Sequence, residues 1–345
     1  MNTELLKQLT DICGVSGDEE RAAEFIINYI KPYATSIETD TMGNIIAFKK
    51  GVGKSRKTVM VCAHTDEVGF IVTGITDDGY LKFEEVGGID DRILLAKRVF
   101  VGENKVNGVL GIKAVHLQSA GERSSVIKIK DMYIDIGAKD KADAQKYASV
   151  GDYVCFNSQF RVLGDKYPKI KAKALDDRLG CLILMELIKN SFENDIYFCF
   201  TVQEEAGLRG ASVLTRRIQP DVALVFECTT ASDVPECDEF MHCTRQGEGP
   251  AISIMDRASY SNKNLNKFIC KVADENNIKY QFKQTTFGGN DAGAVQTLAG
   301  GAQTAVISVP ARYIHSPVST VCISDADGAL ELGKCVLQYI NKYEK

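Results

Sequence analysis

Apolar positions along the chain alternate between helical spacing and short uninterrupted runs. Ser16 and Glu19 form a Ser-x-x-Glu pattern typical of a capping box, and helically spaced apolar residues follow at Ala22, Phe25, Ile26, Tyr29 and Ile30. Residues 58–63, TVMVCA, form an apolar run without alternation, which predicts a strand buried on both faces. The first part of the chain is therefore expected to be α/β.

The pattern changes between residues 69 and 164. This stretch has 12 glycines in 96 residues and many short alternating apolar segments, and only residues 141–148 have a helical pattern. Such a segment is typical of a small antiparallel β domain. Because it interrupts the α/β pattern, we expect a β-rich domain at 69–164 inserted into a catalytic domain formed by residues 1–68 and 165–345.

Alternating helices and strands resume after residue 165. The expected helices are at 177–190, 262–276 and 324–343, and the expected strands are at 196–202, 222–226, 251–255 and 304–309. Strands that alternate with helices predict a mixed, mostly parallel sheet sandwiched by helices. The expected fold class is α/β, with a small antiparallel β-barrel domain inserted.

Composition narrows the class of protein. The chain has 345 residues, of which 45% are hydrophobic and 25% charged, as in a globular protein. A net charge of −5 argues against a nucleic-acid partner, and no apolar stretch is long enough to span a membrane. The N-terminus lacks the charged segment followed by an apolar segment that is typical of a signal peptide.

The eleven cysteines include no CxxC, and we expect reduced, buried thiols in a cytoplasmic protein, among them Cys62, Cys155, Cys199 and Cys228.

Histidines and carboxylates follow four of the predicted strands directly, and a further aspartate precedes a predicted helix. They are His64 with Asp66, Glu204 with Glu205, Glu227, His315, and Asp176. In an open α/β sheet, ligands bind at the carboxyl ends of the strands. A single residue of this kind is usually a solvated loop residue or a helix cap, but coincidence across four strands favours a shared site. His116 and His242 lack such a setting and are left out of it.

Two histidines and several carboxylates suit zinc, cobalt or manganese. Asp176, Glu205 and Glu227 supply three negative charges, which two divalent ions balance better than one, so we expect two metal ions. Glu204 would then be free to shuttle a proton in amide hydrolysis. Asp66 would accept the second N–H of His64 and fix its tautomer, although a turn-capping role remains the alternative.

The motifs together resemble one family, the TET-type aminopeptidases, which are cytosolic dinuclear metallopeptidases of the MH clan. The motifs are AHTDE at 63–67, ALDDR at 174–178, QEE at 203–205, ECTTA at 227–231 and RYIHSP at 312–317. The resemblance covers the whole chain and implies a zinc-peptidase-like fold. It also implies that the inserted domain mediates dimer contacts and that dimers assemble into a tetrahedral dodecamer.

The resemblance further implies a role for each residue of the site. His64 and Glu227 would hold one metal ion, Glu205 and His315 the other, and Asp176 would bridge the two. Glu204 would be the general acid/base and Asp66 would orient His64. The segment FGGNDAGA at 287–294 is similar to a glycine-rich family segment near the substrate, so that Gly289 and Asp291 are implied to be substrate-binding.

Three features depart from the family pattern or complicate it. Glu227 stands where many relatives have Asp, and Asn290 stands where the family often has Thr. Asp177 directly follows Asp176, so the bridging residue depends on where the helix begins. The family pattern places the bridge at the first Asp of the pair.

The sequence therefore predicts a dinuclear metallo-aminopeptidase that hydrolyses the N-terminal residue from short peptides, using a metal-bridging hydroxide with Glu204 as general acid/base. A related deacylase or carboxypeptidase is an alternative, since these enzymes share dinuclear sites and differ in their substrate pockets. A non-catalytic assembly or peptide-binding protein that retains the fold is another. The preferred N-terminal residue, the physiological metal and the choice between dimer and dodecamer are left open.

Overall fold

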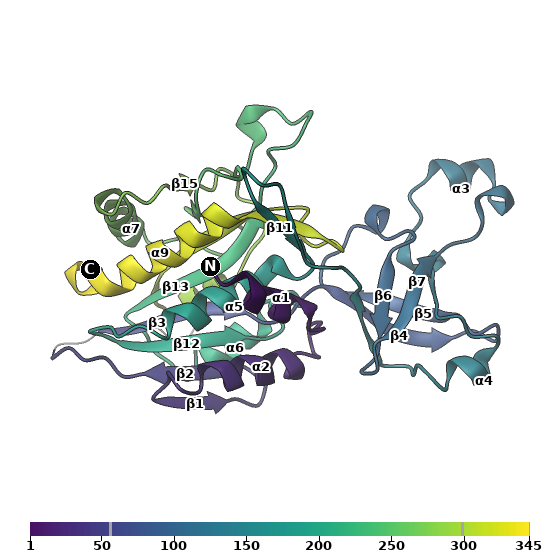
Figure 1. Cartoon of the computed structure of the whole chain (residues 1–345), viewed down its shortest axis with the longest axis horizontal. Helices are drawn as coiled ribbons and strands as arrows, with labels where there is room; N and C mark the ends of the chain where they lie inside the picture. Colours follow the sequence, from purple (N-terminus) through teal and green to yellow (C-terminus); the bar gives the residue numbers. More distant parts are fainter. Residues whose placement is uncertain (55–56, 298–299, 345) are drawn as a thin grey trace.

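The computed structural model describes residues 1–54, 57–297 and 300–344, and it consists of two lobes (Figure 1). The larger lobe contains a mixed sheet with helices on both faces, and the smaller lobe is a closed antiparallel barrel. This is the expected α/β fold with an inserted β-barrel. In the part of the chain that the structure describes, no helix is long and apolar enough to cross a bilayer.

The large sheet is parallel at its centre and antiparallel toward its edges. The central strands pair in parallel in the order β12 (Asp195–Thr201), β3 (Thr58–His64), β13 (Val222–Thr230) and β16 (Gln303–Arg312). The outer strands pair in antiparallel fashion: β1 (Ser36–Thr39) and β2 (Ile45–Lys49) on one side, and β17 (Ser319–Cys322), β11 (Lys169–Ala172) and β10 (Arg161–Leu163) on the other. The short β14 (Ala251–Ile252) pairs with β16 and with β15 (Gln281–Phe282).

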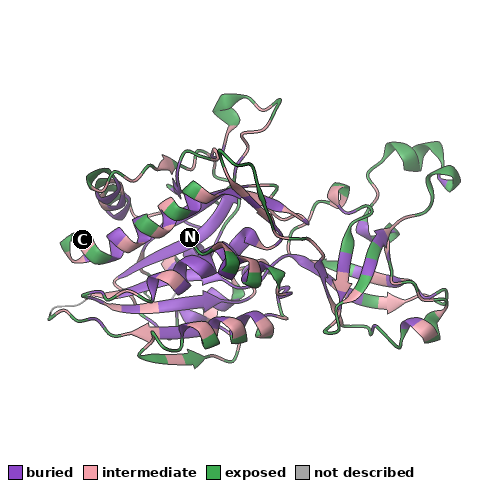
Figure 2. Ribbon diagram, viewed as in Figure 1, coloured by how far each residue is buried: buried purple, intermediate pink, exposed green. Residues whose placement is uncertain are grey.

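Alternate side chains of the central strands enter two different cores, so that these strands are buried on both faces as expected. In Figure 2 the central strands are coloured mostly as buried. Val59 and Val61 of β3 pack toward one set of helices, which comprises α1 (Thr3–Asp11), α2 (Glu20–Ile30), α5 (Leu175–Leu187), α7 (Lys263–Glu275) and α9 (Ile323–Tyr339). Met60 and Cys62 face the other side, where α6 (Arg209–Leu214) and α8 (Ala292–Thr297) pack. The unbroken apolar pattern of the strand follows from this two-sided burial.

The smaller lobe is a six-stranded closed barrel. Its strands are β4 (Gly69–Ile75), β5 (Leu81–Val86), β8 (Tyr133–Asp135), β7 (Val106–Gly111), β6 (Arg98–Val101) and β9 (Tyr153–Phe156). Phe70 packs edge-on against both Phe83 and Phe156 inside it. Besides α4 (Lys141–Ala144), the lobe contains the helix α3 (Ala120–Ser124), so the expectation of a single helical segment was wrong. A capping box between Ser119 and Glu122 explains α3.

Other expected features also differ from the structure. Ser16 and Glu19 form no capping box: α2 has Glu19 at its N-cap without a side-chain bond, and the Ser16 hydroxyl donates to Asp66 instead. Strand β14 ends at Ile252 and not at residue 255. The last long helix ends at Tyr339, and the 3₁₀ turn Ile340–Lys342 follows. Further 3₁₀ turns are Asp91–Ile93, Val115–Leu117, Ile129–Asp131 and Glu239–Met241.

One expectation about the cysteines was wrong. Cys13 and Cys155 form a disulfide that joins the segment before α2 to strand β9 of the barrel. The two residues are 142 positions apart, so only the placement of the barrel against the larger lobe brings them together. Cys62, Cys199 and Cys228 are free and buried, as expected.

Candidate metal centre

The histidines and carboxylates singled out from the sequence meet at one edge of the large sheet. His64 ends β3, Glu227 lies within β13, and Glu204 and His315 follow β12 and β16. These four strands run parallel, so their carboxyl ends lie side by side. Asp176 reaches the same edge from the first turn of α5.

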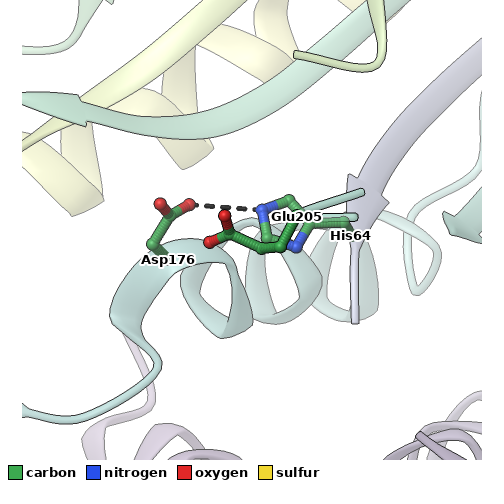
Figure 3. Close-up of side chains that lie close together, drawn as sticks. All are labelled: His64, Asp176 and Glu205. Carbon is green, nitrogen blue, oxygen red and sulfur yellow. Dashed lines mark hydrogen bonds and ion pairs between the residues drawn. The ribbon is translucent and has the colours of Figure 1, made fainter. Parts of the chain in front are cut away.

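Asp176 lies between the two histidines. Its Oδ1 is 3.3 Å from Nε2 of His64, and its Oδ2 is 3.3 Å from Nε2 of His315. Figure 3 shows the Asp176 carboxylate pointing toward His64, with Glu205 beside the pair. One carboxylate therefore faces both imidazoles, each through a different oxygen.

Each histidine has a second carboxylate of its own. Glu227 Oε1 lies 3.4 Å from Nε2 of His64, and Glu205 Oε1 lies 3.3 Å from Nε2 of His315. Ligand atoms of His64, Asp176 and Glu205 all lie within 4.8 Å of one another. By the Nε2 distances each imidazole has one glutamate of its own and shares Asp176 with the other imidazole, and the cluster is tight enough that Glu205 also lies near His64.

Asp177 is turned toward the backbone of neighbouring elements. Its Oδ2 accepts a hydrogen bond from the His64 N–H at 3.3 Å, and its Oδ1 accepts one from the Gly180 N–H at 2.9 Å. The peptide between Asp176 and Asp177 is cis. Although Asp177 also lies near His64 and Glu227, it is Asp176 that stands between the two histidines.

Asp66 connects His64 to the adjacent glutamates. Its Oδ1 accepts from the Glu204 N–H at 3.0 Å and lies 3.4 Å from Nδ1 of His64. Its Oδ2 accepts from the Glu205 N–H at 3.1 Å and from the Ser16 hydroxyl at 2.6 Å. Burial alone would raise the pKa of Asp66, but the contacts with His64, Ser16 and Glu204 lower it. The carboxylate is therefore kept ionised and fixed.

The remaining carboxylates repel one another. Burial, followed by the charges of neighbouring carboxylates, raises the pKa of Glu204 and Glu227 well above the usual range and that of Glu205 to about 7. No lysine or arginine of the described residues forms an ion pair with these carboxylates. The buried Lys173 and Arg178 pair with Glu67. A buried cluster of carboxylates and imidazoles without a basic partner fits divalent cations by both charge and donor type.

The cluster opens into a cavity of about 680 Å³. Gly289 lines this cavity, as expected of a residue near a substrate. Asp291 does not: it is 1% exposed, lies behind the cavity wall and accepts a hydrogen bond from the Thr201 hydroxyl. Burial raises the pKa of Asp291 to about 6. The expectation that Asp291 touches the substrate is therefore not supported by its position.

Two contributors to the site were missed in the sequence. The Gly88 carbonyl, at the edge of the barrel, lies 3.1 Å from Nδ1 of His315, and the Ser16 hydroxyl holds Asp66. No sequence signal marks Gly88, and the pattern at Ser16 indicates a helix cap rather than a contact with Asp66. His116 and His242 lie outside the cluster, as expected; His116 is in an exposed 3₁₀ turn and His242 is bonded to the Cys237 carbonyl.

Comparison with known proteins gives the family. Residues 43–332 match the family model described as M42 glutamyl aminopeptidase. The chain is 31% identical over 343 residues to the lysyl aminopeptidase of Pyrococcus furiosus, with 97% of this chain and 96% of that protein covered.

Solved structures agree with this assignment. The chain resembles the TET aminopeptidase of the marine sediment archaeon Thaumarchaeota archaeon SCGC AB-539-E09, with a TM-score of 0.93, 35% identity, and 97% and 95% of the two chains covered. It also resembles the TET1 peptidase of Pyrococcus horikoshii, which can assemble into a tetrahedron or a large octahedral shell, with a TM-score of 0.86, 36% identity, and 97% and 98% covered. This chain therefore belongs to the M42 glutamyl aminopeptidase family and is a hydrolase of the aminopeptidase class.

Proposed function

We propose that the chain removes the N-terminal residue from short peptides with the help of two divalent cations held in the cluster. His64 and Glu227 would hold one ion, His315 and Glu205 the other, and Asp176 would bridge them. The observation that carries this proposal is the position of Asp176, whose two oxygens each lie 3.3 Å from a different imidazole. Zinc is the proposed ion, and cobalt and manganese suit the same donors.

A pair of such ions, when bound, would activate a water molecule and polarise the scissile carbonyl. Glu204 is the proposed general acid/base. It lines the cavity, and its Oε2 is 4.0 Å from Nε2 of His64, farther than the oxygens of Asp176 and Glu227. A carboxylate at this position would take a proton from the attacking water and pass it to the leaving amine.

Asp66 is the proposed positioning residue for this chemistry. It accepts the N–H of both Glu204 and Glu205 and lies beside Nδ1 of His64. The Asp66 backbone carbonyl, 3.1 Å from Nδ1 of His64, would fix the tautomer of that ligand, and the Asp66 carboxylate would fix the direction of the general base. Gly289 contributes to the wall against which the substrate binds.

The organisation of the whole chain is also part of the proposal. Residues 1–68 and 165–345 would form the catalytic domain together with β10, which pairs with β11 in the large sheet, so the boundary expected at residue 164 lies too late in the chain. The rest of residues 69–164 would form a domain that mediates dimer contacts. Dimers of a cytoplasmic protein would then assemble into a dodecamer, as the tetrahedral assembly of the related TET1 peptidase suggests. Sedimentation of the purified protein measures the size of the particle.

Glu204→Gln tests the mechanism. The substitution keeps the size of the side chain and removes its ability to take a proton, so we expect kcat to fall by about 10²- to 10⁴-fold while the metal content per chain is retained. Near-native turnover would exclude Glu204 from the role. The control is removal of the ions with a chelator, which should abolish activity until zinc, cobalt or manganese is added back.

The substrate class needs a separate comparison. Peptides with a free amino terminus should be hydrolysed, and the same peptides with a blocked amino terminus should not. Equal hydrolysis of both would favour a deacylase or carboxypeptidase. Absence of metal and of hydrolysis, even after metal is added, would favour a non-catalytic binding protein.

A further inference from the structure

A second cavity, of about 750 Å³, adjoins the first at Ile314 and His315. One wall comes from residues 88–97 of the barrel lobe and the other from residues 313–318, which follow β16. We call it the interlobe cleft. Ile314 and His315 line both cavities, so the two cavities meet at these residues.

Hydrolysis of a peptide bond at the metal centre requires space on both sides of the bond. The first cavity contains Glu204, Glu227 and Asp176 and is the space into which the candidate catalytic groups project. The interlobe cleft borders the same centre at His315 and is lined by none of the other candidate ligands. Its position therefore suits the part of a peptide that lies beyond the bond being cut.

The lining of the interlobe cleft is mostly apolar. Ile89 and Ile93 contribute from the barrel lobe, and Tyr313, Pro317 and Val318 contribute from the larger lobe. Apolar walls of this kind bury a hydrophobic side chain favourably, by about 25 cal/mol for each Å² removed from water. An aliphatic or aromatic residue next to the scissile bond would be bound there in preference to glycine.

The two charged side chains at the walls of the interlobe cleft, Asp90 and Lys97, differ in whether they form an ion pair. Asp90 is bound by the Arg92 guanidinium, which donates to both of its oxygens. Lys97 lines the cleft and forms no ion pair with any residue that the structure describes. An ammonium group without a partner at an apolar cleft is suited to a carboxylate ligand.

We propose that the interlobe cleft binds the leaving portion of a short peptide, with the C-terminal carboxylate of that peptide at Lys97. This rests on the proposed aminopeptidase function and adds a substrate class to it: free peptides of a few residues with an apolar second residue. A longer peptide carries its carboxylate past Lys97, so the contact favours peptides of one particular short length.

The test compares peptides that differ only in their C-terminus. Di-, tri- and tetrapeptides with the same N-terminal residue and leucine at the second position are prepared as free acids and as amides. At one of these lengths, the native enzyme should hydrolyse the free acid with a kcat/KM about fivefold above that of the amide, the effect of one partly exposed ion pair. Lys97→Gln should bring this ratio close to one, and Lys97→Arg should largely preserve it.

Arg98→Gln is the matched control. It removes the same charge from the adjacent position of the chain but does not line the interlobe cleft, so it should leave the acid-to-amide ratio unchanged. An acid-to-amide ratio near one for the native enzyme at every length would overturn the proposal, as would an equal loss in Lys97→Gln and Arg98→Gln. A change of particle size in Lys97→Gln would instead assign the cleft to a contact between copies of the chain. If no peptide is cleaved at all, it is the proposed function that fails.

Discussion

Replacing Asp66 with asparagine exchanges one acceptor oxygen for a donor without changing the size of the side chain. The native carboxylate accepts hydrogen bonds from the Ser16 hydroxyl and from the N–H groups of Glu204 and Glu205. It is completely buried. An amide group cannot satisfy all of these donors, because its nitrogen must face at least one of them.

The least costly placement puts the new amide nitrogen beside Ser16, whose hydroxyl can rotate and accept from it. The Glu205 N–H then points at a nitrogen and loses its acceptor. A buried donor without an acceptor costs about 1–3 kcal/mol, and hydrogen bonds to a charged group contribute about 1.5–3 kcal/mol. We therefore expect Asp66→Asn to lower the free energy of unfolding by about 2–4 kcal/mol.

Urea unfolding in the presence of a chelator measures this change without a contribution from bound metal. Ser16→Ala is the control: it removes one hydrogen bond to the same carboxylate and leaves both backbone donors satisfied, so it should cost only about 1–2 kcal/mol. With metal restored, Asp66→Asn should also lower kcat/KM by about 10- to 100-fold, as expected for a residue that supports a metal ligand. An asparagine variant within about 0.5 kcal/mol of the native protein and with unchanged kcat/KM would refute the reasoning.

Three further substitutions test other parts of the structure. In the native chain the buried Lys173 ammonium lies 2.6 Å from the Glu67 carboxylate. Glu67→Gln removes this counter-ion and should lower the free energy of unfolding, measured in urea, by about 3–5 kcal/mol. Burial raises the pKa of Glu19 from 4.5 to about 7, so between these pH values the folded state holds a proton that the unfolded chain releases. The contribution of protonated Glu19 to the free energy of unfolding is therefore complete below about pH 4.5 and is lost as the pH rises through about 7. The stability of Glu19→Gln relative to the native protein should therefore increase from pH 5 to pH 8, and a constant difference would contradict this. Lys283 is the only lysine or arginine among the described residues lining the first cavity, so Lys283→Glu should lower kcat/KM for peptides with an N-terminal glutamate about fivefold relative to those with an N-terminal leucine.

The centre of the sheet could be predicted because burial on two faces leaves a visible pattern. Residues 58–63 are apolar without alternation, and their side chains enter two separate cores. The edges of the sheet could not be predicted in the same way. Strand β14 has two residues, and it is a strand only because β16 and β15 lie beside it. So short a segment has no periodicity of its own.

The candidate ligands could be found because each follows a strand that is itself recognisable. His64 and Glu227 lie in β3 and β13, which are neighbours and parallel, so that proximity in space follows from the topology. The Gly88 carbonyl and the Cys13–Cys155 disulfide depend instead on how the barrel is placed against the larger lobe. No local pattern encodes that placement, and the interlobe cleft was missed for the same reason.

The glutamate at position 227, where many TET-type relatives have aspartate, illustrates how the two kinds of information combine. The sequence shows an additional methylene group and indicates only that the carboxylate reaches further. In the structure, Glu227 Oε1 accepts a hydrogen bond at 3.0 Å from the N–H of the next residue, Cys228, and the same oxygen lies 3.4 Å from His64. The side chain is therefore folded back onto its own strand, and the additional length does not carry the carboxylate out of the cluster. A change in side-chain length can thus be compatible with the same donor set, because the backbone N–H fixes where the oxygen lies.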